Sequence, residues 1–83
     1  MPKVNELTQR ELDILANADR FSAVSFRDRS EHPTMAAAQR AAEEASAKTH
    51  RGAVVYAIGE VCGTEASAAV AFYKPGKGWE MAA

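Results

Sequence analysis

Few side chains in this 83-residue sequence are of the kinds that carry out covalent chemistry. The two histidines, His32 and His50, stand at opposite ends of an expected helix over residues 35–49. At about 1.5 Å of rise per residue they lie roughly 25 Å apart, so they cannot ligate the same metal ion. The single cysteine, Cys62, has no evident base that would activate it as a nucleophile, and we expect a bystander thiol in a turn. We therefore predict that the chain is not an enzyme and has no metal site and no cofactor.

The glycine and carboxylate patterns do not indicate a phosphate-binding or catalytic site either. The segment KPGKG at residues 74–78 follows an expected strand. A phosphate-binding loop is followed by a helix start, which is missing here, so the segment predicts a tight type II turn. Glu43 and Glu44 are adjacent on the expected helix, so their side chains point about 100° apart. We interpret them as part of a solvated helix face.

A hairpin near the end of the chain carries the first group of candidate partner-binding residues. Tyr73 and Trp79 flank a turn that contains Lys74 and Lys77. Aromatic side chains beside cations can anchor a protein interface or stack on nucleic-acid bases. The alternative is that the two aromatic rings form a cross-strand pair that closes the hairpin, and both roles can hold together.

The second group of candidates lies around the first expected strand, where Arg27 and Arg29 form part of a basic region. Acidic residues interleave with these arginines, among them Asp28 and Glu31. Mixed charge of this kind is typical of a solvated surface, and a partner-binding role for Arg27 and Arg29 is the alternative.

Composition and charge narrow the class of function. The net charge is −1, with 25% charged and 47% hydrophobic residues, which is typical of a globular protein. Dedicated nucleic-acid binders usually show a clear basic excess, so direct nucleic-acid binding is not expected. No apolar run approaches the ~18 residues of a membrane span. The first residues lack the apolar core of a signal peptide, so we expect a cytoplasmic protein with no membrane partner.

Two helices are expected from their capping signals. Thr8 and Glu11 have the spacing of a capping box, which predicts a helix over residues 9–17 after a frayed lead-in at residues 1–6. The residues expected on its inward face are Leu12, Leu15 and Ala16. Thr34 is a natural N-cap for the helix over residues 35–49. The residues expected on the inward stripe of this second helix are Met35, Ala38, Ala41, Ala42, Ala45 and Thr49.

Strands are expected where apolar side chains alternate along the chain. The predicted strands are at residues 20–27, 53–58 and 65–73, with room for a short last strand at residues 79–81. Residues 28–33 are predicted to form a loop, Gly52 to stop the second helix, and Gly59 to begin a turn region.

The order α-β-α-β-β, with the short fourth strand in addition, predicts one α+β domain over residues 1–83. The expected architecture is a small two-layer sandwich with the helices on one face of the sheet. If the first two strands are neighbours, the helix between them makes a right-handed crossover. The other sheet face would be thinly covered and could receive a partner. A chain with few large apolar residues can supplement its core by association, and we expect a monomer or a weak dimer.

The part of the chain from about residue 34 to 81 also resembles a known family. A helix, a strand reading RGAVVYAI and a hairpin with Tyr73, Lys74, Gly76, Lys77 and Trp79 are similar to small phage-encoded anti-CRISPR inhibitors of type I CRISPR-Cas systems. The resemblance implies a non-enzymatic protein in the cytoplasm of a bacterial host. It also implies binding to the crRNA-guided surveillance complex, Cascade, and a block of target DNA recruitment. The alternatives are a small nucleic-acid-binding regulator and a bacterial or phage protein of another role.

Overall fold

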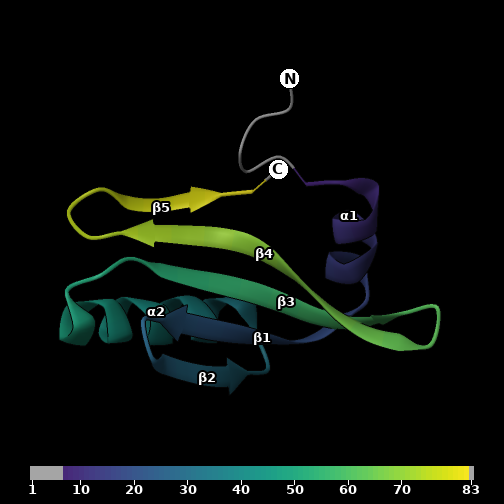
Figure 1. Cartoon of the computed structure of the whole chain (residues 1–83), viewed down its shortest axis with the longest axis horizontal. Coiled ribbons are helices and arrows are strands. Elements are labelled where there is room, and N and C mark those ends of the chain that lie inside the picture. The colour runs from purple at the N-terminus through teal and green to yellow at the C-terminus, as the bar shows by residue number, and fades with distance from the viewer. Residues whose placement is uncertain (1–6, 83) are drawn as a thin grey trace.

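The computed structural model describes residues 7–82, so the predicted lead-in at residues 1–6 lies outside the described part of the chain. The elements are α1 (Gln9–Ala16), β1 (Ala18–Ser25), β2 (Asp28–His32), α2 (Met35–Thr49), β3 (Ala53–Val61), β4 (Thr64–Lys74) and β5 (Gly78–Met81). The strands form one antiparallel sheet in the order β2-β1-β3-β4-β5 (Figure 1). The predicted small α+β fold is confirmed.

One strand was not predicted. Residues 28–33 were expected to form a loop, but Asp28–His32 forms the strand β2. Its five residues, DRSEH, include no apolar side chain, so alternating hydrophobicity gives no signal for it. The strand pairs antiparallel with β1 along its whole length, from Ser25 opposite Asp28 to Phe21 opposite His32. The predicted strand over residues 20–27 therefore ends early, at Ser25, and Phe26 begins the turn into β2.

The extra strand also changes the predicted crossover. The first and second predicted strands, β1 and β3, are neighbours as supposed, but they pair antiparallel. Because β1 and β2 form a hairpin, the chain enters α2 from β2, at the edge of the sheet. The helical connection therefore joins β2 to β3, with β1 between them.

Helix α1 begins as predicted but packs through a different residue. The capping box is present: the Thr8 backbone N–H donates to Glu11 Oε1 at 3.0 Å, and the Glu11 N–H donates to Thr8 Oγ1 at 3.2 Å. The expected inward residue Leu12 is 42% exposed, whereas Ile14 is 2% exposed. Of the predicted inward residues, Leu15 is half-buried and packs against the core, whereas Leu12 and Ala16 are exposed, because α1 is short and lies over one end of the sheet, against β3 and β4.

Helix α2 has the predicted bounds, with a different C-terminal stop. Thr34 Oγ1 accepts a hydrogen bond from the Ala37 N–H at 3.2 Å, as expected for an N-cap. The helix ends at His50, which adopts a left-handed conformation with φ 59°, so the predicted stop at Gly52 was wrong. The His50 N–H donates to the Ser46 carbonyl at 2.8 Å. The buried residues of α2 are Ala38, Ala42 and Ser46, of which the first two were predicted.

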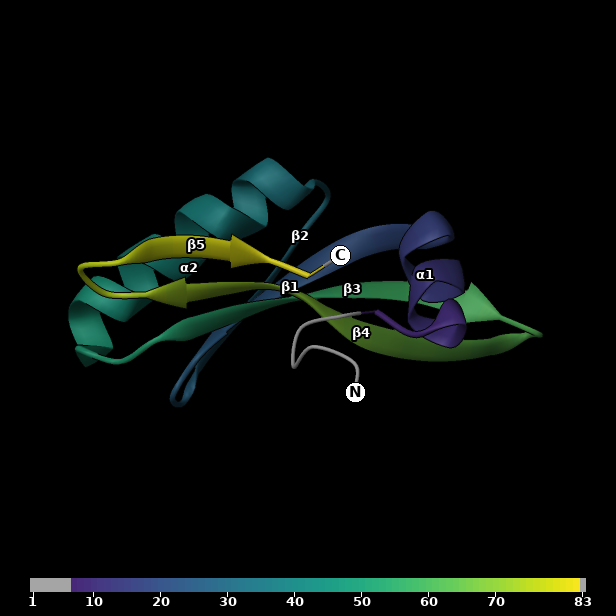
Figure 2. The same cartoon turned by 90° about the horizontal axis from the view of Figure 1, so that it is seen from above.

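The three other predicted strands are confirmed, and β3 is longer than expected. It continues through Gly59 to Val61, and the turn into β4 is made by Cys62 and Gly63. Both turn residues have positive φ, 53° and 77°. The central pair of strands, β3 and β4, therefore forms a long hairpin, with α2 towards one end and α1 at the other (Figures 1 and 2).

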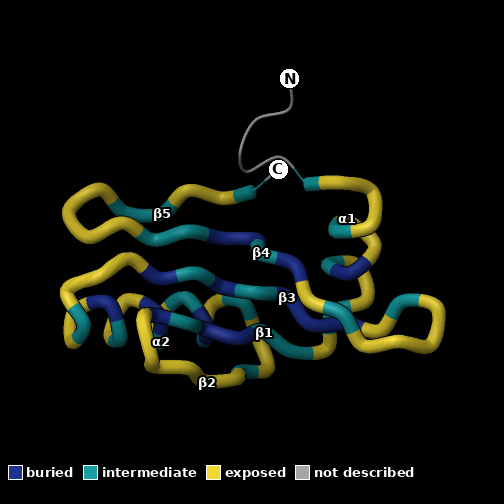
Figure 3. The backbone as a smooth tube through the Cα atoms, viewed as in Figure 1, coloured by how far each residue is buried: buried dark blue, intermediate teal, exposed yellow. Residues whose placement is uncertain are grey.

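The core between the helices and the sheet is built mainly from alanine. The buried cluster contains Ile14, Ala23, Ala38, Ala42, Ala53, Val55, Ala57, Ala68, Val70 and Ala71. Small side chains on α2 and on the central strands let the two layers approach closely. Burial is concentrated in β1, β3 and β4 and along one side of α2, while β2 and the turns are exposed (Figure 3).

Strand pairing divides the sheet into two faces. Ala23 is paired with Val55 and belongs to the buried cluster, so it lies on the face that the helices cover. Ser22 and Val24 alternate with it and therefore lie on the opposite face, which we call the open face. Cross-strand partners and alternation along the strands extend the open face to further residues, which include Arg20, Arg29, Glu31, Val54, Tyr56, Ile58, Glu65, Ser67, Phe72 and Lys74.

Candidate functional site

The two aromatic residues of the C-terminal hairpin meet on the helix side of the sheet. Tyr73 and Trp79 are cross-strand partners, and their ring centroids lie 5.1 Å apart with an interplanar angle of 49°. Trp79 Nε1 donates a hydrogen bond to Glu43 Oε2 at 2.6 Å, which ties the hairpin to α2. Both aromatic side chains are half-buried. The contact closes the hairpin, as one of the two sequence interpretations expected.

The hairpin lysines lie apart from this aromatic pair. Lys74 follows Tyr73 directly in β4, so its side chain points to the opposite face of the sheet. Lys77 lies in the turn and donates its backbone N–H to the Lys74 carbonyl at 2.9 Å. Gly76 has φ 80°, as the predicted type II turn requires. Both lysines are exposed and open to a partner, but the aromatic rings are turned away from Lys74.

Arg27 lies in the β1–β2 turn beside an exposed aromatic ring. Its guanidinium carbon is 5.3 Å from the centroid of Phe26, and that of Arg51 is 4.5 Å from the same centroid. Phe26 is 57% exposed and has φ 54°, an unusual backbone conformation for a large side chain. The strand predicted over residues 20–27 included Phe26. Because Ser25 pairs with Asp28 at the start of β2, Phe26 lies in the turn between β1 and β2, where its side chain is exposed.

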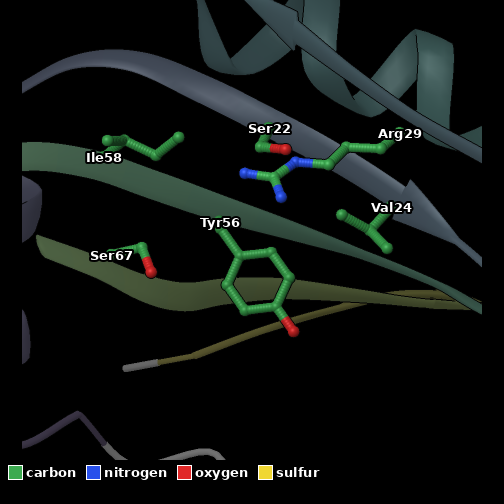
Figure 4. A pocket seen from close by; sticks show the side chains of 6 residues that line it. All are labelled: Ser22, Val24, Arg29, Tyr56, Ile58 and Ser67. Atoms are coloured by element: carbon green, nitrogen blue, oxygen red, sulfur yellow. The ribbon is translucent and has the colours of Figure 1, made fainter.

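Arg29 is a predicted candidate that lies on the open face, where it borders a hollow of about 280 Å³. Four neighbouring strands contribute to the hollow: β1, β2, β3 and β4. The residues that line it are Ser22, Val24, Arg29, Tyr56, Ile58 and Ser67 (Figure 4). Figure 4 shows the guanidinium end of Arg29 reaching from β2 across β1 towards Ser22. The hollow therefore combines a cation and three hydroxyl-bearing side chains with aliphatic walls.

Ser22 is the buried polar residue of this hollow. It is 1% exposed, and its Oγ has no hydrogen-bond partner within residues 7–82. The other two buried serines behave differently: Ser25 Oγ lies 2.7 Å from Thr49 Oγ1 and donates to the Gly52 carbonyl, and Ser46 Oγ donates to the Arg51 carbonyl. A buried hydroxyl without a partner is uncommon in folded proteins, so Ser22 is a candidate for a binding role that sequence analysis missed.

The charges at the end of the open face distinguish its two arginines. Arg20 is engaged by three carboxylates, with contacts of 3.1 Å to Asp19, 3.2 Å to Glu31 and 2.7 Å to Glu65. The hydrogen bond that the Arg20 guanidinium donates to the Glu65 carboxylate is the main cause of the raised pKa of Arg20. Arg29, by contrast, has no carboxylate at ion-pair distance among the described residues. The positive charge beside the hollow is therefore free to meet a negatively charged group.

The side chains with potential for covalent chemistry lie in separate parts of the fold. His32 is at the end of β2, where its Nε2 is 2.7 Å from Ser30 Oγ, and His50 caps α2. Cys62 is exposed in the β3–β4 turn as a free thiol. Among residues 7–82, no group of three His, Cys, Asp or Glu side chains is placed to hold a metal ion.

No family model, curated protein or solved structure matches this chain. Neither helix in the described part of the chain has the length and apolar character needed to cross a lipid bilayer. The candidate site therefore rests on the geometry of the open face and the chemistry of its side chains.

Proposed function

We propose that this chain is a non-enzymatic binding module whose open face docks against a protein or a ribonucleoprotein complex. The observation that carries the proposal is the one-sided sheet: both helices pack on the same face, and the described helices leave the other free. On that face Val24, Val54 and Tyr56 are only partly buried, and Arg29, which has no carboxylate partner among residues 7–82, lies beside them. Apolar side chains flanked by unpaired charge are typical of surfaces that bind partners.

The charges favour a protein surface over nucleic acid. Glu31 and Glu65 lie at one end of the open face, and the chain has a net charge of −1. Binding along a phosphate backbone depends on several basic side chains that displace counterions, and carboxylates on the same face oppose it. A protein surface with apolar residues and one or a few carboxylates complements the open face better.

The sharpest form of the proposal names a type I surveillance complex as the partner, in the cytoplasm of a bacterial host. It rests on the resemblance of the hairpin at residues 73–79 to small anti-CRISPR proteins. Lys74 lies on the same side of the sheet as Phe72 and Tyr56, so one partner can contact the open face and the hairpin lysine together. Occupation of the complex by the chain would then block recruitment of target DNA.

The test is a binding and competition assay with a purified type I surveillance complex. The chain is expected to co-elute with the complex at micromolar concentration and to prevent target DNA binding. Tyr56→Ala is expected to weaken binding about thirtyfold, the effect of losing an interface anchor. The double charge reversal Lys74→Glu/Lys77→Glu is expected to weaken binding while the midpoint of thermal unfolding stays unchanged, because exposed charges contribute little to stability.

Charge reversal of Arg10 is the matched control, because Arg10 is an exposed cation on α1, away from the open face. Arg10→Glu is expected to leave binding unchanged. Failure to detect a complex at micromolar concentration would remove the anti-CRISPR form of the proposal. Retention of binding by Tyr56→Ala, with loss of binding by Arg27→Glu, would move the interface to the β1–β2 turn and contradict the open-face proposal.

A further inference from the structure

The hollow on the open face is lined by Ser22, whose hydroxyl forms no hydrogen bond within residues 7–82. Ser22 Oγ is buried and has no hydrogen-bond partner among residues 7–82, although Ser25 and Ser46, equally buried, are both bonded. Buried polar atoms without a partner are selected against unless they serve another purpose. Ser22 lines the hollow, but its Oγ is closed off from solvent, with the Arg29 guanidinium beside it (Figure 4), so a bound group supplies the missing hydrogen bond once the Arg29 side chain shifts to meet that group.

Arg29 gives the hollow its charge. Its guanidinium reaches towards Ser22 and has no carboxylate partner in the described chain (Figure 4). A guanidinium is a planar donor that matches the two oxygens of a carboxylate. The hydroxyls of Tyr56 and Ser67 add further polar groups at the margin of the same hollow.

The remaining walls select the kind of anion. Val24 and Ile58 are aliphatic and suit a short apolar stem behind the charged group. Glu31 and Glu65, which pair with Arg20 on this face, disfavour a doubly charged ligand such as phosphate. One cation, a few hydroxyls and an aliphatic wall together fit a singly charged carboxylate on a short chain.

We propose that the hollow lined by Ser22, Arg29 and Tyr56 is a seat for a carboxylate, supplied by an acidic side chain of the protein partner. The inference rests on the proposed function for the source of the carboxylate and names the chemistry that the open face recognises. The carboxylate accepts hydrogen bonds from the Arg29 guanidinium and the Ser22 hydroxyl, while its methylene groups contact Val24 and Ile58. The partner is thus selected by an acidic residue that projects from its surface.

The experiment uses the isolated chain and a titration followed by backbone amide NMR. The probe is N-acetyl-glutamate amide, and its neutral isostere N-acetyl-glutamine amide is the control ligand. The glutamate probe is expected to shift the amides of Ser22, Arg29 and Tyr56 in a saturable way at millimolar concentration. Arg29→Gln is expected to weaken the probe about tenfold or more, because a charge-assisted hydrogen bond is lost. The control variant Arg27→Gln is expected to leave the probe's affinity unchanged.

Thermal unfolding supplies a readout that does not depend on any ligand. Ser25→Ala is expected to lower the unfolding midpoint by about 4–8 °C, because the hydrogen bonds of the Ser25 hydroxyl with Thr49 and with the Gly52 carbonyl are lost. Ser22→Ala is expected to leave the midpoint unchanged or to raise it, because the Ser22 hydroxyl has no hydrogen-bond partner in the described part of the chain. A decrease for Ser22→Ala as large as that for Ser25→Ala would show that the hydroxyl serves the fold, and would overturn the inference.

The remaining outcomes separate this inference from the proposed function. Equal responses to the glutamate and glutamine probes, or tighter binding of inorganic phosphate, would overturn the carboxylate seat. If that happens while Tyr56→Ala still weakens partner binding about thirtyfold, the open face remains the interface and only the seat is wrong. If the glutamate probe binds as expected but Tyr56→Ala retains partner binding, the seat stands as a carboxylate site and the open-face interface is wrong.

Discussion

Replacement of Gly59 by alanine is expected to lower the free energy of unfolding by about 2–3 kcal/mol. Gly59 lies in β3 directly beneath the C-terminal end of α1, and a Cβ atom at this position would lie 2.7 Å from the Ile14 carbonyl oxygen. It would also lie 2.8 Å from the backbone carbon and oxygen of Asn17. These are main-chain atoms, so relief requires the whole of α1 to move away from the sheet. Such a movement exposes Ile14, the one buried side chain of that helix.

The measurement is thermal and urea denaturation of the variant, with an expected fall in the midpoint of roughly 10–20 °C. Gly63→Ala is the control, because a Cβ there meets no atom within 4 Å, although the residue has φ +77°. The control is expected to cost only about 1 kcal/mol, the penalty for a left-handed alanine. Equal destabilisation by the two variants would contradict the account of how α1 is docked.

Truncation of Trp79 to alanine is expected to cost about 2 kcal/mol of stability. The side chain contributes the ring contact with Tyr73, the hydrogen bond to Glu43 and packing against the edge of the core. Half-burial makes the cost smaller than the 3–5 kcal/mol typical of a fully buried aromatic residue. Trp79→Phe keeps a ring but removes the N–H donor, and is expected to cost about 1 kcal/mol.

Denaturation curves of the two Trp79 variants, beside Lys77→Ala as an exposed control from the same hairpin, measure these effects. Lys77→Ala is expected to change stability by less than ~0.5 kcal/mol. If Trp79→Ala leaves stability unchanged but abolishes partner binding, the ring is an interface anchor, and the account in which Trp79 holds β5 against α2 is wrong.

Local signals were sufficient to predict most of the fold. The capping box at Thr8 and Glu11 and the N-cap at Thr34 predicted the starts of both helices. Alternating apolar residues predicted the central strands β3 and β4, whose side chains separate into a buried and a partly exposed set. These features depend on residues close together in the sequence, which is why they can be recognised without a structure.

Features that depend on long-range contacts were missed. β2 is a polar edge strand, held by pairing with β1 and not by burial of its own side chains. The burial of Ile14 instead of Leu12 follows from the contact of α1 with Gly59, far along the chain. His50 ends α2 in a left-handed conformation, for which glycine is the usual sequence signal. The end of the helix was therefore predicted at Gly52, two residues after the observed cap.

The candidate site was predictable only in its outline. A thinly covered sheet face was expected from the number of helices, and Arg29 was among the candidate residues. The proposed role of Ser22 was not predictable, because it depends on the Ser22 hydroxyl having no hydrogen-bond partner among residues 7–82 after four strands have come together. Arg29 reaches the same hollow only because residues 28–32 form a strand that the sequence did not indicate.

The central claim is that a partner covers the open face, and methyl cross-saturation in the complex with a type I surveillance assembly tests it most directly. Val24, Val54 and Ile58 carry methyl groups on the open face, whereas those of Val55 and Ile14 lie in the core on the helix side. The account predicts strong attenuation of the first three signals and little change in the other two. Attenuation confined to the helix side or to the β1–β2 turn, or no attenuation on the open face, would contradict it.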